Sequence, residues 1–244
     1  MTTPATNVPH SIINSAMGDA GLLQEGDEAN SEQLAKHMTR LNDIVNLEQA
    51  RPGVKLWLLV DQSVTLVAGQ GGLGNPYTFK PAGTVNMTKP LKAIQGFYLD
   101  SSGANRRPIY PMSWDEWNRL SAVTQQGQIS QFFVDKRQLE LDVYFWLIPN
   151  ASAATGVVHL LLQTQVTNSI SLTDAMAFPI EWTLYLRWQL ASEICTGQPQ
   201  AIVANCNARA KEYRDILEGW DVEDSPMQFQ MDQRMSNFGV SNFS

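Results

Sequence analysis

Residues 129–150 read ISQFFVDKRQLELDVYFWLIPN, two strand-like runs separated by a short polar turn. Aromatic and β-branched side chains, which favour strands, are frequent in both runs. The turn, Asp135-Lys136-Arg137-Gln138, consists of charged and polar residues. This stretch predicts a hairpin of two antiparallel strands, Ile129–Val134 and Leu139–Ile148.

The same strand-like character extends on both sides of the hairpin. Further strands are predicted at Leu56–Val67, Tyr77–Phe79, Leu91–Leu99 and Val157–Val166. One short helix interrupts them, because Ser113 and Glu116 have the spacing of a capping box, ahead of Trp117 and Leu120. The middle of the chain is therefore predicted to be β-rich.

Helical periodicity appears before and after this region. A short helix is predicted at Ser11–Ala20, and a longer one opens with a capping box formed by Asn30 and Gln33. The longer helix has an apolar stripe of Leu34, Met38, Leu41 and Val45, and Pro52-Gly53 ends it.

Two more helices are predicted towards the C-terminus. Pro179 suits the first helical turn, and Gly197 separates the two helices. The first stripe consists of Ile180, Leu184, Trp188, Ala191 and Cys195, and the second of Ile202, Cys206, Ala210, Tyr213 and Leu217.

The predicted fold class is α+β. A helical unit is formed by the N- and C-terminal helices, an antiparallel β-rich domain is inserted between them, and an extended C-terminal tail follows. The predicted boundaries are 10–53 for the N-terminal helices, 54–172 for the inserted domain, 173–221 for the C-terminal helices and 222–244 for the tail.

The tail combines Gln and Asn residues with spaced apolar side chains. From Asp224 onward it has no sustained helical stripe. A purely solvating tail is depleted in Phe and Met, so this segment is predicted to be an arm that orders on a partner. The alternatives are a disordered end and a segment that packs on its own subunit. The predicted anchors are Met227, Phe229, Met231, Met235, Phe238 and Phe243.

Composition argues against several classes of protein. The 244 residues are 43% hydrophobic, which suffices for a core, and the net charge of −7 disfavours tight phosphate binding. The chain has no apolar run long enough for a transmembrane helix and no signal-peptide pattern. Cys195 and Cys206 are interpreted as buried thiols in a reducing compartment.

No catalytic, cofactor-binding or metal-binding residue is predicted, and the chain is not expected to be an enzyme. Gly69–Gly74 matches GxGxxG, but strand-like residues follow where a dinucleotide site needs a helix. Glu140 and Asp142 are the only carboxylates that suit a glycosidase pair, and their spacing also describes the wet side of a strand. His159 is interpreted as a structural residue and His37 as solvent-facing.

The tryptophans are divided between core and surface. Trp146, Trp182 and Trp188 are expected in the core because they lie in apolar stretches. An interface role is left open for Trp114, Trp117 and Trp220, since tryptophan is enriched at protein interfaces.

Four segments resemble a known family when taken in order. They are IINSAMGDAGLLQEGDEANSEQLAKHMTRLNDIVN at 12–46, LWLLVDQSVTLVAGQ at 56–70 with YTF after it, the hairpin at 129–150, and FPIEWTLYLRWQLASEIC at 178–195. Their order and spacing resemble the podovirus head-to-tail adaptor family, also called packaged-DNA stabilisation or tail accessory proteins.

The resemblance implies a structural subunit of the virion neck, assembled in the host cytoplasm. Twelve copies would form a ring under the portal protein, extend the DNA channel, help to retain packaged DNA and provide the attachment site for tail, nozzle or tail-fibre proteins. Double-stranded DNA would pass through without sequence-specific binding, and no membrane is involved. C-terminal extensions in the family lash onto the portal, and the tail lies where such an arm would start.

Two alternatives stay open. One is another neck or tail component of the virion with the same build. The other is a β-rich domain that binds carbohydrate or hydrolyses cell walls, which would need exposed aromatic side chains on one sheet face and a working carboxylate pair.

Overall fold

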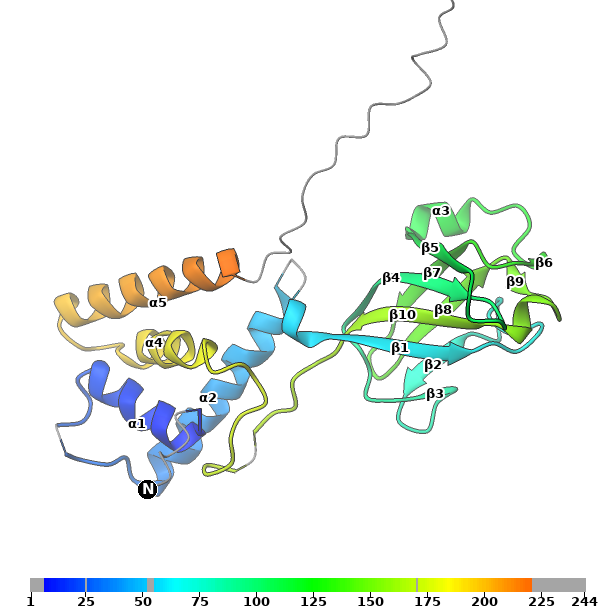
Figure 1. The fold of residues 1–244 in the computed structure, drawn as a ribbon. Helices are drawn as coiled ribbons and strands as arrows, with labels where there is room; N and C mark the ends of the chain where they lie inside the picture. Colours follow the sequence, from blue (N-terminus) through cyan, green and yellow to red (C-terminus); the bar gives the residue numbers. More distant parts are fainter. Residues whose placement is uncertain (1–6, 25, 52–54, 170, 221–244) are drawn as a thin grey trace, which may run out of the picture.

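The structure is a computed structural model that describes residues 7–24, 26–51, 55–169 and 171–220. Within these ranges the fold is mixed α/β, with five α-helices and a large, mostly antiparallel sheet. The helices other than α3 lie at one end of the molecule and the sheet at the other (Figure 1). The predicted arm, 222–244, lies outside the described residues.

Two of the helices, α2 and α3, begin at the capping boxes that the sequence predicts. Asn30 Oδ1 accepts from Gln33 N at 2.9 Å and Gln33 Oε1 accepts from Asn30 N at 3.0 Å, which confirms the predicted capping box. Ser113 and Glu116 form the second one, also as predicted. The helices are α1 (Pro9–Asp19), α2 (Ser31–Ala50), α3 (Trp114–Asn118), α4 (Trp182–Ile194) and α5 (Gln200–Trp220).

Eight strands form the main sheet in the order β1-β10-β4-β5-β7-β8-β2-β3. The predicted hairpin is confirmed as β7 and β8, which pair antiparallel with Val134 opposite Val143. The strands are β1 (Leu59–Thr65), β2 (Tyr77–Lys80), β3 (Val85–Asn86), β4 (Lys92–Leu99), β5 (Arg106–Met112), β7 (Gln131–Lys136), β8 (Leu141–Trp146) and β10 (Val157–Gln163), with β6 (Gln126–Gly127) and β9 (Ile148–Pro149) in a separate pair.

Strand β5 was not predicted. Its sequence, RRPIYPM, contains Pro108 and Pro111, and proline usually argues against a strand because it cannot donate to the ladder. The strand nevertheless pairs antiparallel with β4 and parallel with β7. It joins the two halves of the sheet.

The helices bury a common apolar cluster. Ile13 of α1, Leu41 of α2, Leu190 of α4 and Cys206 of α5 belong to it. Arg187 of α4 also contacts α1, where its Nη2 lies 2.6 Å from Asp19 Oδ1. Burial of this apolar surface is the main stabilising contribution to the packing of these helices.

A second cluster lies on one face of the sheet. Tyr77, Phe132, Phe145 and Leu160 are among its buried members. None of the cluster residues of the sheet belongs to α1, α2, α4 or α5, so the helices and the sheet have separate apolar cores in the described part of the chain.

The structure corrects several details of the helix prediction. Helix α4 begins at Trp182, so Pro179 precedes it, and Ile180 and Leu184 of the predicted stripe are exposed. The buried face contains Tyr185, Leu186 and Leu190 instead. The stripe of α5 is as predicted, with Cys206, Ala210 and Leu217 buried.

Two side chains lie in other surroundings than predicted. His37 is not solvent-facing: only 6% of its surface is exposed, because α2 packs against α1 and α4 around it. Trp117 is buried against Phe133 and is not available to a partner.

Candidate interaction surfaces

A row of side chains crosses the outer face of the sheet on four neighbouring strands. Asp61 of β1 lies 3.0 Å from His159 Nδ1 on β10, and the His159 ring stacks on Phe97 of β4 with centroids 4.7 Å apart. The guanidinium carbon of Arg106, on β5, lies 3.6 Å from the Phe97 ring centroid. We call these four residues the cross-strand row.

The strand order brings these four residues together. His159 is opposite Phe97 in the ladder, and alternate residues of a strand lie on one face. Because β10 and β5 flank β4 on opposite sides, His159 and Arg106 cover opposite faces of the Phe97 ring. A sugar stacks on a free aromatic face, so Phe97 does not offer the platform that a carbohydrate-binding sheet needs.

A hollow of about 360 Å³ lies beside the row. Asp61 and Arg106 contribute opposite charges to its lining, and Leu161 and Pro108 contribute apolar surface. Such a mixed surface suits contact with another protein, where a polar rim surrounds apolar contacts.

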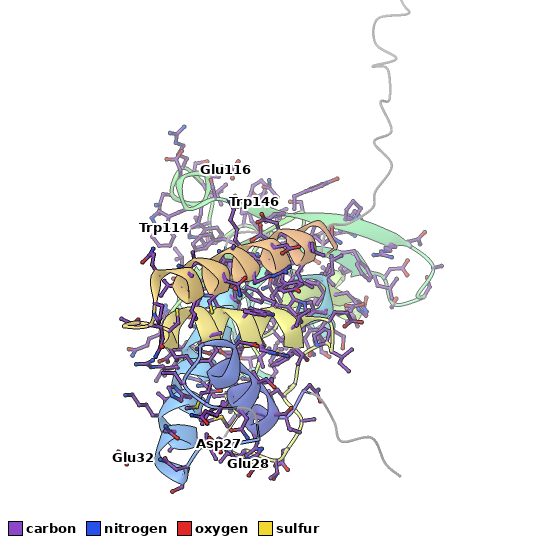
Figure 2. All side chains as sticks on the ribbon, turned by 90° about the vertical axis from the view of Figure 1, so that its left-hand side faces the viewer. Asp27, Glu28, Glu32, Trp114, Glu116 and Trp146 are labelled. Carbon is purple, nitrogen blue, oxygen red and sulfur yellow. The ribbon has the colours of Figure 1, made fainter. Side chains whose placement is uncertain are left out.

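Aromatic side chains gather where α3 covers the outer face of the sheet. Trp117 stacks on Phe133 at 5.2 Å, and Trp114 lies 5.0 Å from the same ring. Trp114 remains 60% exposed, as does Tyr110 of the neighbouring β5. In Figure 2 Trp114, Glu116 and Trp146 lie at one end of the molecule, and the acidic Asp27, Glu28 and Glu32 at the other. The exposed aromatic pair is a second candidate contact surface, of the kind that forms interface hot spots.

Strand β1 forms one edge of the sheet. It pairs with β10 on one side, and no described strand pairs with its other side. An edge strand presents N–H and C=O groups that another chain can pair with. Val60 is exposed on this strand. The charge of Asp61 disfavours nonspecific pairing of this edge with strands of other chains.

The carboxylates of Glu140 and Asp142 are held in ion pairs. Lys80 Nζ lies 2.6 Å from Glu140 Oε2, and Arg137 Nη1 lies 3.2 Å from Asp142 Oδ2. Asp142, which is 1% exposed, also accepts from Thr78 Oγ1 at 2.7 Å. The hydrogen bond from Lys80 is the main cause that lowers the pKa of Glu140, and a general acid needs the opposite shift. Glu140 and Asp142 therefore belong to a structural ion-pair network with Lys80 and Arg137.

Glu140 should make the stability of the fold depend on pH. Its pKa in the folded protein lies below the usual 4.5, so ionised Glu140 stabilises the fold above that value. The stabilisation is lost as the pH falls through the folded pKa. Glu140→Gln should therefore lower the free energy of unfolding at neutral pH and leave it equal to that of the unmodified protein in acid.

Urea unfolding at the two pH values measures this effect. Lys80→Gln is the matched variant, because its effect should largely disappear in the Glu140→Gln background if the two side chains act as a pair. An equal loss at both pH values would refute the ion-pair explanation.

The glycine-rich segment at 69–74 is a loop that packs on the sheet. Gly71 has a φ of +101°, and its oxygen accepts from Phe145 N at 2.8 Å. Gly71 N donates to Asn75 O at 2.8 Å, so this amide is used within the loop. Strand β2 follows, as the sequence predicts, in place of the helix that a dinucleotide site requires.

The paired basic residues are engaged in contacts within the chain. Arg106 stacks on Phe97, and Arg107 Nη2 donates to Ile129 O at 3.2 Å. Arg137 contacts Asp135, Glu140 and Asp142. The carboxylates offset the charge of Arg137, whereas Arg106 and Arg107 are exposed, and their contacts to an aromatic ring and a carbonyl leave their charge in place.

Cysteine and histidine side chains show no metal-site geometry. Cys195 and Cys206 are free and buried, as predicted, and burial is the main cause that raises the pKa of Cys206 to about 11. Among the described residues no group of three or more His, Cys, Asp or Glu side chains could hold a metal ion. None of the described helices is both long and apolar enough to cross a membrane.

The sequence did not predict the cross-strand row or the exposed edge. His159 was expected to be structural, and the structure places it half-buried in a pair with Asp61. The only feature of the sequence that indicated a place for His159 on the outer face was its alternation with residues that are buried along its strand. The predicted anchors of the arm and the Trp220 side chain lie outside what the structure describes.

Comparison with known proteins assigns no family to this chain. No protein-family model matches the chain, and no curated protein matches it significantly.

Proposed function

We propose that this chain is a structural subunit of a phage head-to-tail connector. A ring of its copies docks under the portal, extends the DNA channel, helps to retain packaged DNA and offers a surface to the next tail protein. The observation that supports this most is the order of elements: two helices, a β-rich region, two helices and an apolar-anchored tail. The same order characterises the adaptor family that the sequence resembles.

The architecture that goes with this function is also a proposal. The helices before and after the sheet would form one helical unit, and the β-rich region would be inserted into it. The shared apolar cluster of α1, α2, α4 and α5 supports this division, as does the separate cluster of the sheet.

A closed ring needs two different patches on each subunit, because its contacts are head-to-tail. The edge of β1 and the exposed pair Tyr110 and Trp114 are unlike each other in chemistry. In the sheet, β10 and β4 separate β1 from β5, the strand that carries Tyr110. This asymmetry supports a subunit that contacts two neighbours through different surfaces.

The charge distribution suits a channel through which DNA slides. The net charge of −7 and the carboxylates that pair with Arg137 leave little overall attraction for phosphates. DNA would therefore not be held tightly by this chain.

Sedimentation velocity tests the proposal. Alone, the protein should sediment as a monomer of 27.2 kDa, because the arm gains its partner only at the portal. Mixed with the portal protein encoded in the same genome, it should sediment with the portal. Stable rings without the portal would contradict this order of assembly, and no binding to the portal at all would favour another neck or tail component.

A further inference from the structure

A polar hollow lies between the end of α1, the first half of α2 and the end of α4, three helices that pack against one another (Figure 1). Its volume is about 480 Å³, against about 30 Å³ for a water molecule in the liquid, so it has room for a small ligand. The side chains that α2 contributes follow the spacing of one helix face, and they are Gln33, Lys36, His37 and Arg40.

Two cationic side chains reach this hollow without an ion-pair partner. Lys36 is exposed and Arg40 is half-buried, and no carboxylate of the described residues forms an ion pair with either of them. Glu193 is the only carboxylate among the residues described in the lining. It offsets one of the two positive charges, so the hollow keeps an excess of positive charge in a chain whose net charge is −7.

His37 adds a hydrogen-bond donor between these cations. Its side chain is 6% exposed, and Nδ1 is buried without a hydrogen-bond partner. Nε2 remains accessible and has no partner among the described residues. Because an N–H on Nδ1 would lack an acceptor, the neutral ring carries its proton on Nε2. Since His37 lines the hollow, this N–H can donate to a ligand that lies there.

The His37 ring is neutral at neutral pH. Burial is the main cause that lowers its pKa below 6.5, and the charges of Arg40 and Lys36 lower it further. The effect of both cations on the ring also places the three groups near one another. An anion in the hollow would therefore be attracted by two positive charges and accept a hydrogen bond from neutral His37.

We propose that this hollow binds a small oxyanion, with Arg40 and Lys36 as its counter-charges and Nε2–H of His37 as a donor. A guanidinium donates to two oxygens of one oxyanion, and an ammonium binds a phosphate as a point charge. The ligand is free phosphate or a phosphate monoester, whose organic part would contact the apolar side of the lining, Met17, Leu22 and Ile194. The proposal goes beyond the connector function and does not depend on it.

Titration of the full chain with sulfate, followed by NMR and calorimetry at constant ionic strength, tests the proposal. Binding should be saturable and should shift the Nε2 resonance of His37. Arg40→Gln should weaken binding by about tenfold, because it removes a hydrogen bond between charged groups. Glu193→Gln should tighten binding, because it removes a carboxylate that repels the anion. Arg209→Gln is the matched control, since Arg209 is an exposed residue of α5 outside the hollow.

Two further comparisons define the donor and the ligand. His37→Phe keeps a ring and removes the donor, so it should also weaken binding, with circular dichroism as the control for folding. Phenyl phosphate and inorganic phosphate separate the two sources of the oxyanion. Tighter binding of phenyl phosphate would identify a monoester, and binding no tighter than that of phosphate would identify the free ion.

Three outcomes would overturn the proposal. The first is the absence of saturable binding. The second is equal affinity in Arg40→Gln and Arg209→Gln, because the anion would then respond only to the overall charge. The third is unchanged affinity in a folded His37→Phe variant, which would remove Nε2 from the site. The portal is absent from this experiment, so its result is separate from that of the sedimentation test.

Discussion

A chain that ends at Glu223 is expected to remain folded and soluble and to lose its binding to portal rings. The truncated chain keeps the residues described in the two apolar cores, among them Leu190 of the helices and Phe145 of the sheet, and we expect these to suffice for folding. The arm carries the anchors that we propose for the portal. Deletion should therefore reduce the share that sediments with the portal to background.

Point variants separate the anchors from the rest of the arm. Phe238→Ser together with Phe243→Ser should reproduce the loss with the length of the arm unchanged. Circular dichroism serves as the control for folding. Normal assembly of the truncated chain would show that the arm does not dock the subunit, and the connector proposal would then need another portal contact.

Leu190→Ala is expected to destabilise the helices by about 2–5 kcal/mol, because it leaves a cavity in a packed core. Leu190 is fully buried among residues of α1, α2, α4 and α5. If the helices form a unit with its own core, their amides should exchange faster while those of β7, β8 and β10 keep their protection.

Leu184→Ala on the same helix is the matched control. Its side chain is 41% exposed, so the free energy of unfolding should change by about 0.5 kcal/mol or less. Equal loss of protection in the sheet after Leu190→Ala would show that the two cores unfold together. The division into a helical unit and an inserted domain would then be wrong.

Local features were predictable from the sequence. The hairpin of β7 and β8 and both capping boxes depend on residues close together in the chain, and the structure confirms them. The buried face of α4 was not predictable, because this helix contacts α1, α2 and α5 and has apolar residues around most of its surface. Strand β5 was missed because its prolines argue against a strand when the neighbours are unknown.

The candidate surfaces depend on contacts between distant parts of the sequence. Asp61 and His159 are far apart in the sequence and meet only because β1 pairs with β10. The burial of His37 similarly depends on how α2 packs against α1 and α4. Such partners follow from the order of the strands and the packing of the helices, which a single sequence does not specify. The anchors of the arm could be proposed from composition, and they remain a prediction.

Electron microscopy of the protein mixed with its portal is the most direct test of the connector proposal. The account predicts a ring of copies on one face of the portal, coaxial with its channel, and no such ring with the chain that ends at Glu223. Portal particles without added density, or density away from the channel axis, would contradict it.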